Sequence, residues 1–211
     1  MPTRAAFLDL DGVLIDSMSA HAKAWVQMLA EHSLVEDERL IYLREGEKAD
    51  DSVALFLKKH GIELPYAERH AMVERKREIY HTMAPHGLQP EARKLVEELR
   101  RRGIELTIVT GSNRRNVDQT IPPEEQAFFA RIITADNYEH GKPAPDPYLA
   151  ALAQSGCKRE ECRILENAPF GIQAGKAAGI FTVAITTSLP AQYLAEADQI
   201  IETYPEFLNH L

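Results

Sequence analysis

The sequence contains few cysteines and no long hydrophobic run, and both features exclude classes of protein. Its two cysteines, Cys157 and Cys162, have a spacing that fits neither a C-x-x-C redox motif nor a four-ligand zinc site. No apolar stretch approaches the roughly 18–20 residues that a helix needs to cross a bilayer. The first strand-like segment begins almost at once, at Arg4, which leaves no room for a signal peptide. We therefore expect a cytoplasmic protein that does not bind membranes.

An excess of positive charge is also missing. The 211 residues include 24 Lys and Arg against 32 Asp and Glu, which gives a net charge of −8. A phosphate backbone repels a protein of this charge at long range, so nucleic acid is not an expected partner. The length suits one α/β domain, alone or with a small inserted subdomain. We expect a monomer or a small homo-oligomer.

Five short apolar segments, each ending at polar residues, predict buried parallel strands. They are residues 5–8, 104–109, 131–134, 162–165 and 180–185. Helical patterns lie between the later strands, at residues 90–102, 114–119, 147–155 and 170–178. Gly103, Gly156 and Gly179 close three of these helices. Strands that alternate with helices predict an α/β fold with a doubly wound parallel sheet.

Residues 17–84 interrupt this alternation, because they have helical periodicity and no convincing strand. We predict that residues 17–84 form a helical cap inserted into an α/β core of residues 1–16 and 85–211. Ligands in open α/β sheets bind beyond the carboxyl ends of the strands. A helical insertion that leaves the core at this edge would cover the site.

Polar side chains collect at the predicted strand ends. They are Asp9, Asp11, Thr110, Ser112, Glu166 and Asn167. Because a strand alternates its faces with a period of two, Asp9 and Asp11 can point the same way, and Gly12 then permits a sharp turn. Two carboxylates this close repel each other unless a cation shares them, and an all-oxygen site favours magnesium.

Four segments resemble the motifs of the haloacid dehalogenase superfamily, in the same order and across nearly the whole chain. They are Asp9-Leu10-Asp11-Gly12-Val13-Leu14-Ile15-Asp16-Ser17, Val109-Thr110-Gly111-Ser112, Gly141-Lys142-Pro143-Ala144-Pro145 and Glu166-Asn167. The helical insertion after the first strand resembles the subfamily that includes β-phosphoglucomutase and phosphoglycolate phosphatase. The stretch from Asp16 to Trp25, with His21 inside it, resembles β-phosphoglucomutase in particular. The resemblance implies a Rossmann-like core with a helical cap, and Mg²⁺ as the cofactor.

The resemblance also implies roles for the core residues. Asp9 would attack phosphorus and form an aspartyl-phosphate, and Asp11 would act as general acid and then general base. Lys142 would neutralise Asp9 and the phosphoryl group. The residues that would hold phosphoryl oxygens, together with Lys142, are Thr110, Gly111 and Ser112.

The implied magnesium ligands are Asp9, Asp11 through its backbone carbonyl, Glu166 and Asn167. The fourth motif of the family usually presents two acids, whereas here the second is Asn167. At about 4 Å and an effective dielectric constant near 20, a unit charge is worth on the order of 4 kcal/mol before screening. We therefore expect weaker metal binding in the empty enzyme and easier acceptance of a strongly anionic substrate.

Four cap residues are candidates for contact with the substrate: His21, Arg44, Glu45 and Lys76. By resemblance, His21 faces the catalytic aspartate, and the glycine in Arg44-Glu45-Gly46-Glu47 suits a loop that closes over a ligand. A mutase would carry an arginine for the sugar phosphate slightly later in this loop, where the sequence reads Lys48-Ala49-Asp50. This difference argues against a phosphoglucomutase.

The sequence therefore predicts magnesium-dependent hydrolysis of a small phosphorylated metabolite. Inorganic pyrophosphate hydrolysis is the first alternative, because Asn167 reduces the charge of the site and the cap is polar. A sugar-phosphate mutase is the second. A catalytically silent binding or regulatory protein is the alternative of another class, and the intact Asp9, Asp11, Thr110 and Lys142 argue against it. A haloacid dehalogenase would require neither the magnesium pocket nor Asp11.

Overall fold

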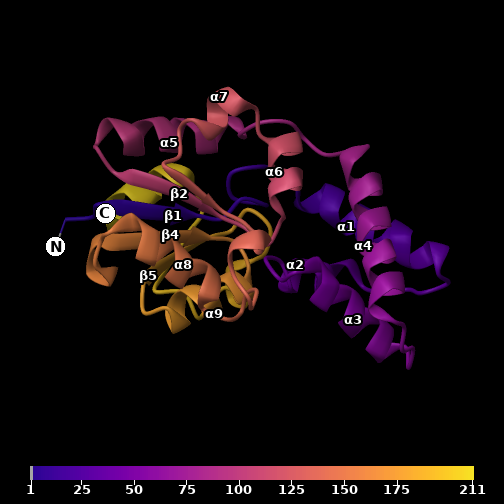
Figure 1. Cartoon of the computed structure of the whole chain (residues 1–211). Coiled ribbons are helices and arrows are strands. Elements are labelled where there is room, and N and C mark those ends of the chain that lie inside the picture. The colour runs from indigo at the N-terminus through magenta and orange to yellow at the C-terminus, as the bar shows by residue number, and fades with distance from the viewer. Residues whose placement is uncertain (1) are drawn as a thin grey trace.

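A six-stranded parallel sheet forms the centre of the core in the computed structural model, which describes residues 2–211 (Figure 1). The strands lie in the order β3-β2-β1-β4-β5-β6. Their bounds are β1 Ala5–Leu8, β2 Glu105–Val109, β3 Arg131–Ile133, β4 Cys162–Glu166, β5 Phe181–Ile185 and β6 Gln199–Ile201. The α/β fold with a doubly wound parallel sheet is confirmed.

Helices cover both faces of the sheet, because alternate residues of each strand point to opposite faces. On β1, Ala6 and Leu8 pack with the helix α5 (Pro90–Arg101) and the C-terminal 3₁₀ helix (Tyr204–His210). Ala5 and Phe7 pack with α8 (Asp146–Ser155) on the other face. The helix α9 (Pro169–Ala177) lies on the same face as α8 (Figure 1). Both faces of the sheet are therefore buried, as the apolar strands require.

The predicted strands and helices of the core are present with small shifts at their ends. Residues 114–119 form most of α6 (Arg114–Thr120). Gly103, Gly156 and Gly179 follow helices with φ of +75°, +66° and +71°, which is the backbone geometry expected of C-terminal caps. The edge strand β6 and the one-turn helix α7 (Pro123–Gln126) were not predicted from the sequence. Three short 3₁₀ turns were also not predicted, at Ala135–Asn137, Arg159–Glu161 and Ala191–Tyr193.

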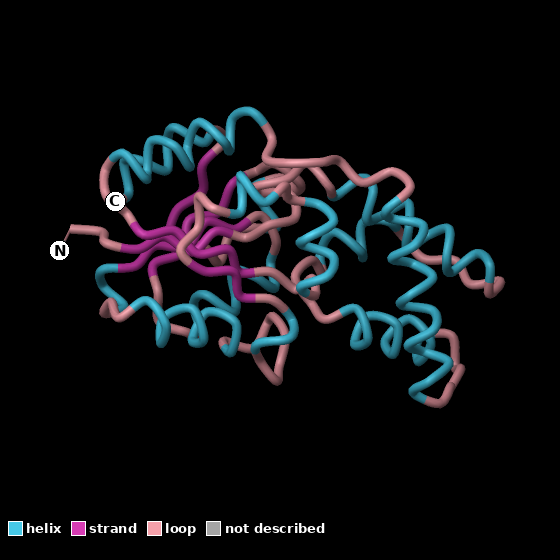
Figure 2. Tube along the Cα trace, turned by 45° about the horizontal axis from the view of Figure 1, so that its top comes forward, coloured by secondary structure: helices cyan, strands magenta, loops and turns pink. Residues whose placement is uncertain are grey.

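Four helices occupy the interval between β1 and α5. They are α1 (Met18–Glu31), α2 (Glu38–Leu43), α3 (Ala49–Lys59) and α4 (Tyr66–His81). They enclose a hydrophobic core of their own, which includes Trp25, Met28, Phe56 and Tyr80. Figure 2 shows this helical cap beside the end of the sheet that lies opposite the two chain termini. Within residues 2–211, no helix combines the length and the apolar character needed to cross a membrane.

The sheet places the candidate site where the order of its strands reverses. The connections lead from β1 towards β2 and β3 on one side, and from β4 towards β5 and β6 on the other. A crevice opens at such a reversal, beyond the carboxyl ends of the strands. Asp9 follows β1, and β4 ends at Glu166. Both residues therefore lie at this crevice, below the cap.

Candidate active site

The two carboxylate oxygens of Asp9 have different surroundings. Oδ1 accepts a hydrogen bond from Nζ of Lys142 at 2.5 Å. Oδ2 is buried and has no hydrogen-bond partner. The backbone amide of Asp9 donates to Leu165 O at 3.0 Å, which extends the pairing of β1 with β4 by one residue. Because buried oxygens are almost always hydrogen-bonded, the unpaired Oδ2 is available to a ligand or a cation.

Lys142 is fully buried and connects Asp9 with Glu166. Its ammonium donates to Glu166 Oε1 at 2.6 Å and to Val109 O at 3.3 Å, in addition to Asp9. Burial acts to lower the pKa of Lys142, but the carboxylates of Asp9 and Glu166 raise it well above its usual value. Lys142 is therefore positively charged beside Asp9, as its predicted role requires.

The carboxylate of Glu166 is occupied by protein partners. Oε1 accepts hydrogen bonds from Lys142 and from the hydroxyl of Tyr148. Oε2 accepts a hydrogen bond from the backbone amide of Asn167 at 3.1 Å. Gly171 makes room for this group, because a Cβ there would lie 2.0 Å from the Glu166 carboxyl carbon. Glu166 holds Lys142 in place in this structure, and a direct magnesium contact from it stays a prediction.

The remaining free oxygens fit a cation. Burial, and then the charge of Glu166, raises the pKa of Asp9 in spite of Lys142, because two carboxylates share one ammonium. Asn167 follows β4, and its Oδ1 is buried without a hydrogen-bond partner, like Oδ2 of Asp9. Across residues 2–211, no three His, Cys, Asp or Glu side chains converge as a metal site. A site built from Asp9 Oδ2 and Asn167 Oδ1 lies outside that pattern, and its oxygen donors suit Mg²⁺.

Asp11 points its carboxylate towards the cap. Gly12 has a φ of +83°, so the sharp turn predicted there is present, and it leads the chain into the cap. Oδ1 of Asp11 accepts from Ser17 Oγ at 2.6 Å and contacts His21 Nε2 at 2.9 Å. Burial opposes the charged form, but His21 and Ser17 lower the pKa of Asp11 to about 2. The carboxylate is therefore ionised at neutral pH.

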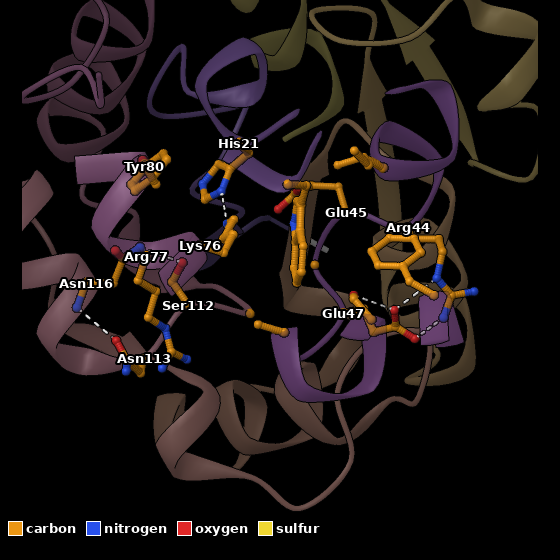
Figure 3. A pocket seen from close by; sticks show the side chains of 17 residues that line it. His21, Arg44, Glu45, Glu47, Lys76, Arg77, Tyr80, Ser112, Asn113 and Asn116 are labelled. Atoms are coloured by element: carbon orange, nitrogen blue, oxygen red, sulfur yellow. Dashed lines mark hydrogen bonds and ion pairs between the residues drawn. The ribbon is translucent and has the colours of Figure 1, made fainter. Parts of the chain in front are cut away.

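His21 links Asp11 to Lys76 on α4. The Nζ of Lys76 lies 2.6 Å from His21 Nδ1, as Figure 3 shows. An ammonium can only donate, so Nδ1 accepts and the proton of the neutral ring is on Nε2, facing Asp11. The ring of Tyr80 stacks on the imidazole with centroids 4.0 Å apart. Burial, followed by the charge of Lys76, lowers the pKa of His21.

The predicted phosphoryl-binding loop lies beside these groups. Ser112 Oγ is 3.4 Å from Asp11 Oδ2, and the Ser112 amide donates to Thr110 Oγ1 at 3.0 Å. Tyr138 holds the backbone of this loop, because its hydroxyl donates a hydrogen bond to Thr110 O at 2.9 Å. A Cβ on Gly111 would lie 2.6 Å from Gly46 O. The cap loop between α2 and α3 therefore rests on the phosphoryl-binding loop, and the cap is closed.

Arg44 lines the same cavity as His21, Glu45 and Lys76, and its contact with a substrate stays a prediction. Its guanidinium bonds to the carboxylate of Glu47 and lies 4.9 Å from the ring centroid of Phe170. Figure 3 shows Arg44 and Glu47 paired with each other, away from His21. The sequence could not show this pairing, because it depends on how the loop turns between α2 and α3. Lys48 is also engaged, since its Nζ donates to Tyr138 O at 2.8 Å and to Glu139 O at 2.7 Å.

A small cavity lies between the cap and the phosphoryl-binding loop. Its volume is about 60 Å³, whereas pockets that bury drug-sized ligands measure about 300–1,000 Å³. Glu45 and Lys76 line it with His21, Trp25 and Ser112. Burial and the charge of Asp11 raise the pKa of Glu45 to about 8, against the effect of Lys76. Glu45 is therefore largely uncharged at neutral pH.

Sequence reasoning missed three partners of the catalytic groups: Ser17, Tyr148 and Ser188. Ser17 is the last residue of the first motif, so its place in that motif could have indicated a contact with Asp11. Tyr148 and Ser188 belong to other segments, and nothing in their local sequence marks them. Their roles become visible only when the sheet brings the segments together.

Known proteins are similar to this chain in sequence. The family model described as haloacid dehalogenase-like hydrolase matches residues 3–179. Hexitol phosphatase A of Escherichia coli is 29% identical over 208 residues, which cover 96% of this chain and 92% of that protein. Beta-phosphoglucomutase of Bacillus subtilis is 28% identical over 196 residues, covering 89% of this chain and 85% of that protein.

A solved structure agrees with these sequence relatives. The putative beta-phosphoglucomutase from Bacteroides vulgatus superposes with a TM-score of 0.85 and 29% identity, covering 99% of this chain and 87% of that one. The superposition covers nearly the whole chain, and therefore both the sheet and the inserted helices. This chain belongs to the haloacid dehalogenase-like hydrolase family, and within it to the β-phosphoglucomutase-like group of enzymes.

Proposed function

We propose that this enzyme is a magnesium-dependent phosphohydrolase that acts on a small phosphorylated metabolite through an aspartyl-phosphate on Asp9. The observation that carries the proposal is the buried pair of Asp9 and Asp11, in which one carboxylate contacts Lys142 and the other contacts His21. The named relatives, which include phosphatases and a phosphoglucomutase, support the reaction class.

The side chains divide the chemistry between two steps. In the first step, one carboxylate oxygen of Asp9 bonds to phosphorus as the bond to the leaving oxygen breaks, and Asp11 delivers a proton to that oxygen. Because Asp11 rests ionised, it must first take up a proton. His21 would pass its Nε2 proton to Asp11 as its Nδ1 accepts a proton from the Lys76 ammonium, so that the ring stays neutral. In the second step, Asp11 accepts a proton from the water that attacks phosphorus, and Asp9 is released as a carboxylate.

Magnesium, held by Asp9 Oδ2, Asn167 Oδ1 and the Asp11 carbonyl, would neutralise charge on the transferring phosphoryl group. Lys142 adds a fixed positive charge from the protein itself. The test is a screen of the purified protein against phosphorylated metabolites, with pyrophosphate included, in magnesium and in excess chelator. A protein that turns over no phosphorylated compound in magnesium would be a silent binding protein instead.

Pyrophosphate remains the second candidate substrate, and the closed cavity favours it. The space of about 60 Å³ under the closed cap suits a small leaving group. The mutase is disfavoured, because a retained sugar bisphosphate needs a cation for its second phosphate. Arg44 is paired with Glu47, and Lys48 donates to two core carbonyls. Lys76 and Arg77 also line the cavity, and Arg77 is paired with Glu74.

Changing Asn167 to aspartate is expected to tighten magnesium binding. The substitution adds a negative charge beside the free oxygen of Asp9, and a carboxylate binds magnesium more strongly than an amide. The measurement is the Mg²⁺ concentration that gives half-maximal activity in wild type and variant. Asn209→Asp is the matched control, because it adds the same charge at an exposed position of the C-terminal 3₁₀ helix. An equal or higher magnesium requirement in Asn167→Asp would place this residue outside the coordination sphere.

Changing Glu45 to alanine is expected to alter substrate selectivity more than phosphorylation of Asp9. Glu45 lines the cavity together with His21, Lys76 and Ser112, and Asp9 is not among its lining residues. Loss of one hydrogen bond to the leaving group, worth about 1 kcal/mol, changes kcat/KM about fivefold. The comparison is kcat/KM for the best substrate of the screen and for a generic aryl phosphate.

Glu45→Gln is the control for this experiment. It keeps the size and hydrogen-bonding capacity of the neutral acid, so its effect at pH 7 should be smaller than that of alanine. Equal losses on both substrates in Glu45→Ala, or no loss on either, would remove Glu45 from substrate selection. His21 and Lys76 would then be the cap residues that contact the leaving group.

A further inference from the structure

The asparagine in the fourth motif must be oriented before it can serve a cation. A carboxylate offers oxygen at both ends, whereas an amide offers oxygen at one end and an NH₂ donor at the other. An inverted Asn167 would therefore direct N–H groups at Mg²⁺, which binds oxygen ligands. Asn167 is fully buried, so water does not select its orientation.

Ser188 is the hydrogen-bond partner of the amide nitrogen. Nδ2 of Asn167 donates to Ser188 Oγ at 2.8 Å, which leaves Oδ1 without a partner. Ser188 follows β5 and is half-buried. It also lines a surface crevice with Asp16 and Met18, where its own hydroxyl proton can reach solvent. The hydroxyl oxygen is then free to accept a hydrogen bond from the side-chain amide of Asn167.

The loop that carries Ser188 is fastened to the D-x-D turn. Thr187, next to Ser188, donates from Oγ1 to Gly12 O at 2.6 Å. A Cβ on Gly12 would lie 2.1 Å from Asn167 Nδ2 and 2.5 Å from Ser188 Oγ. The turn therefore closes directly over the amide–hydroxyl pair. This packing fixes the distance between Ser188 and Asn167.

We infer that Ser188 is a positioning residue that holds Asn167 with its oxygen towards the magnesium ion. The inference rests on the proposed function, because it assumes that the oxygens of Asp9 and Asn167 bind Mg²⁺. It adds a residue outside the four sequence motifs to the metal site. It also gives the asparagine a requirement that an aspartate would not have, since a carboxylate presents oxygen in either orientation.

The test is Mg²⁺ binding to the substrate-free, full-length protein, measured by isothermal titration calorimetry. Ser188→Ala should weaken binding about tenfold, the lower end of the effect of losing a partner of a metal ligand. Ser188→Thr keeps the hydroxyl and should restore most of the affinity. In the Asn167→Asp background, Ser188→Ala should weaken binding by only about two- to threefold, because either carboxylate oxygen can face the ion.

Ser155→Ala is the matched control, because Ser155 is a half-buried serine that bonds to Leu152 O on α8. It should leave the affinity for Mg²⁺ unchanged. Equal losses from Ser188→Ala in both backgrounds, no loss in either, or no recovery with threonine would overturn the inference alone. A wild-type protein that binds no Mg²⁺ would overturn the proposed metal site as well.

Discussion

Replacing Asp9 by asparagine should abolish turnover while leaving the fold intact. An amide oxygen does not attack phosphorus as a carboxylate does, so no phosphorylated enzyme forms. Removing a catalytic nucleophile in a serine protease lowers kcat by a factor on the order of 10⁶, and we expect a loss of that kind here. The measurement is kcat with the best substrate at saturating magnesium.

The fold should tolerate this change because of the local charge balance. In the wild type, Asp9 and Glu166 share the single ammonium of Lys142. Asparagine at position 9 removes one buried negative charge, still offers an oxygen to Lys142, and leaves Glu166 paired. Thermal unfolding of the variant should therefore resemble that of the wild type, or occur at a higher temperature.

Asp16→Asn is a matched control for the chemistry, because Asp16 is an exposed acid in the same segment. It should retain normal turnover. A beryllofluoride adduct on Asp9, found by mass spectrometry in the wild type and absent from Asp9→Asn, would support the nucleophile directly. Normal rates in Asp9→Asn would contradict the mechanism.

The sheet and the position of the catalytic core could be predicted because their signals are local. Ala5–Leu8 is a short, continuous apolar run, as expected of a strand that is buried on both faces. Asp9 follows it directly. The edge strand β6 gave no such signal. It is three residues long, and Gln199 and Ile200 are exposed, so its sequence does not differ from that of a loop.

The contacts between distant segments could not be predicted, because they depend on how close the elements approach. Lys142 was assigned to Asp9 by resemblance, but its second carboxylate, Glu166, follows from the pairing of β1 with β4. Arg44 was expected at the substrate; it lines the cavity, and the turn of the cap loop also pairs it with Glu47, which no local signal predicted. His21 was expected to face the catalytic aspartate, and its contact with Asp11 confirms this.

Asp11→Asn should lower activity by about 10²–10⁴-fold, the usual contribution of a general acid–base group. The substitution is structurally mild. The amide oxygen can still accept from Ser17 and His21, and the amide nitrogen would face the hydroxyl of Ser112. The backbone carbonyl assigned to the metal is unchanged, so Mg²⁺ affinity should stay near that of the wild type.

The leaving group then distinguishes the two roles of Asp11. An aryl phosphate has a leaving oxygen of low basicity that needs little protonation, whereas an alkyl phosphate needs a general acid. Asp11→Asn should therefore slow formation of the aspartyl-phosphate much more with the alkyl ester than with the aryl ester. Its breakdown should be slow after either substrate, because the base that accepts the proton of water is missing. Single-turnover measurements separate these steps, and equal slowing of the first step for both esters would show that Asp11 does not protonate the leaving oxygen.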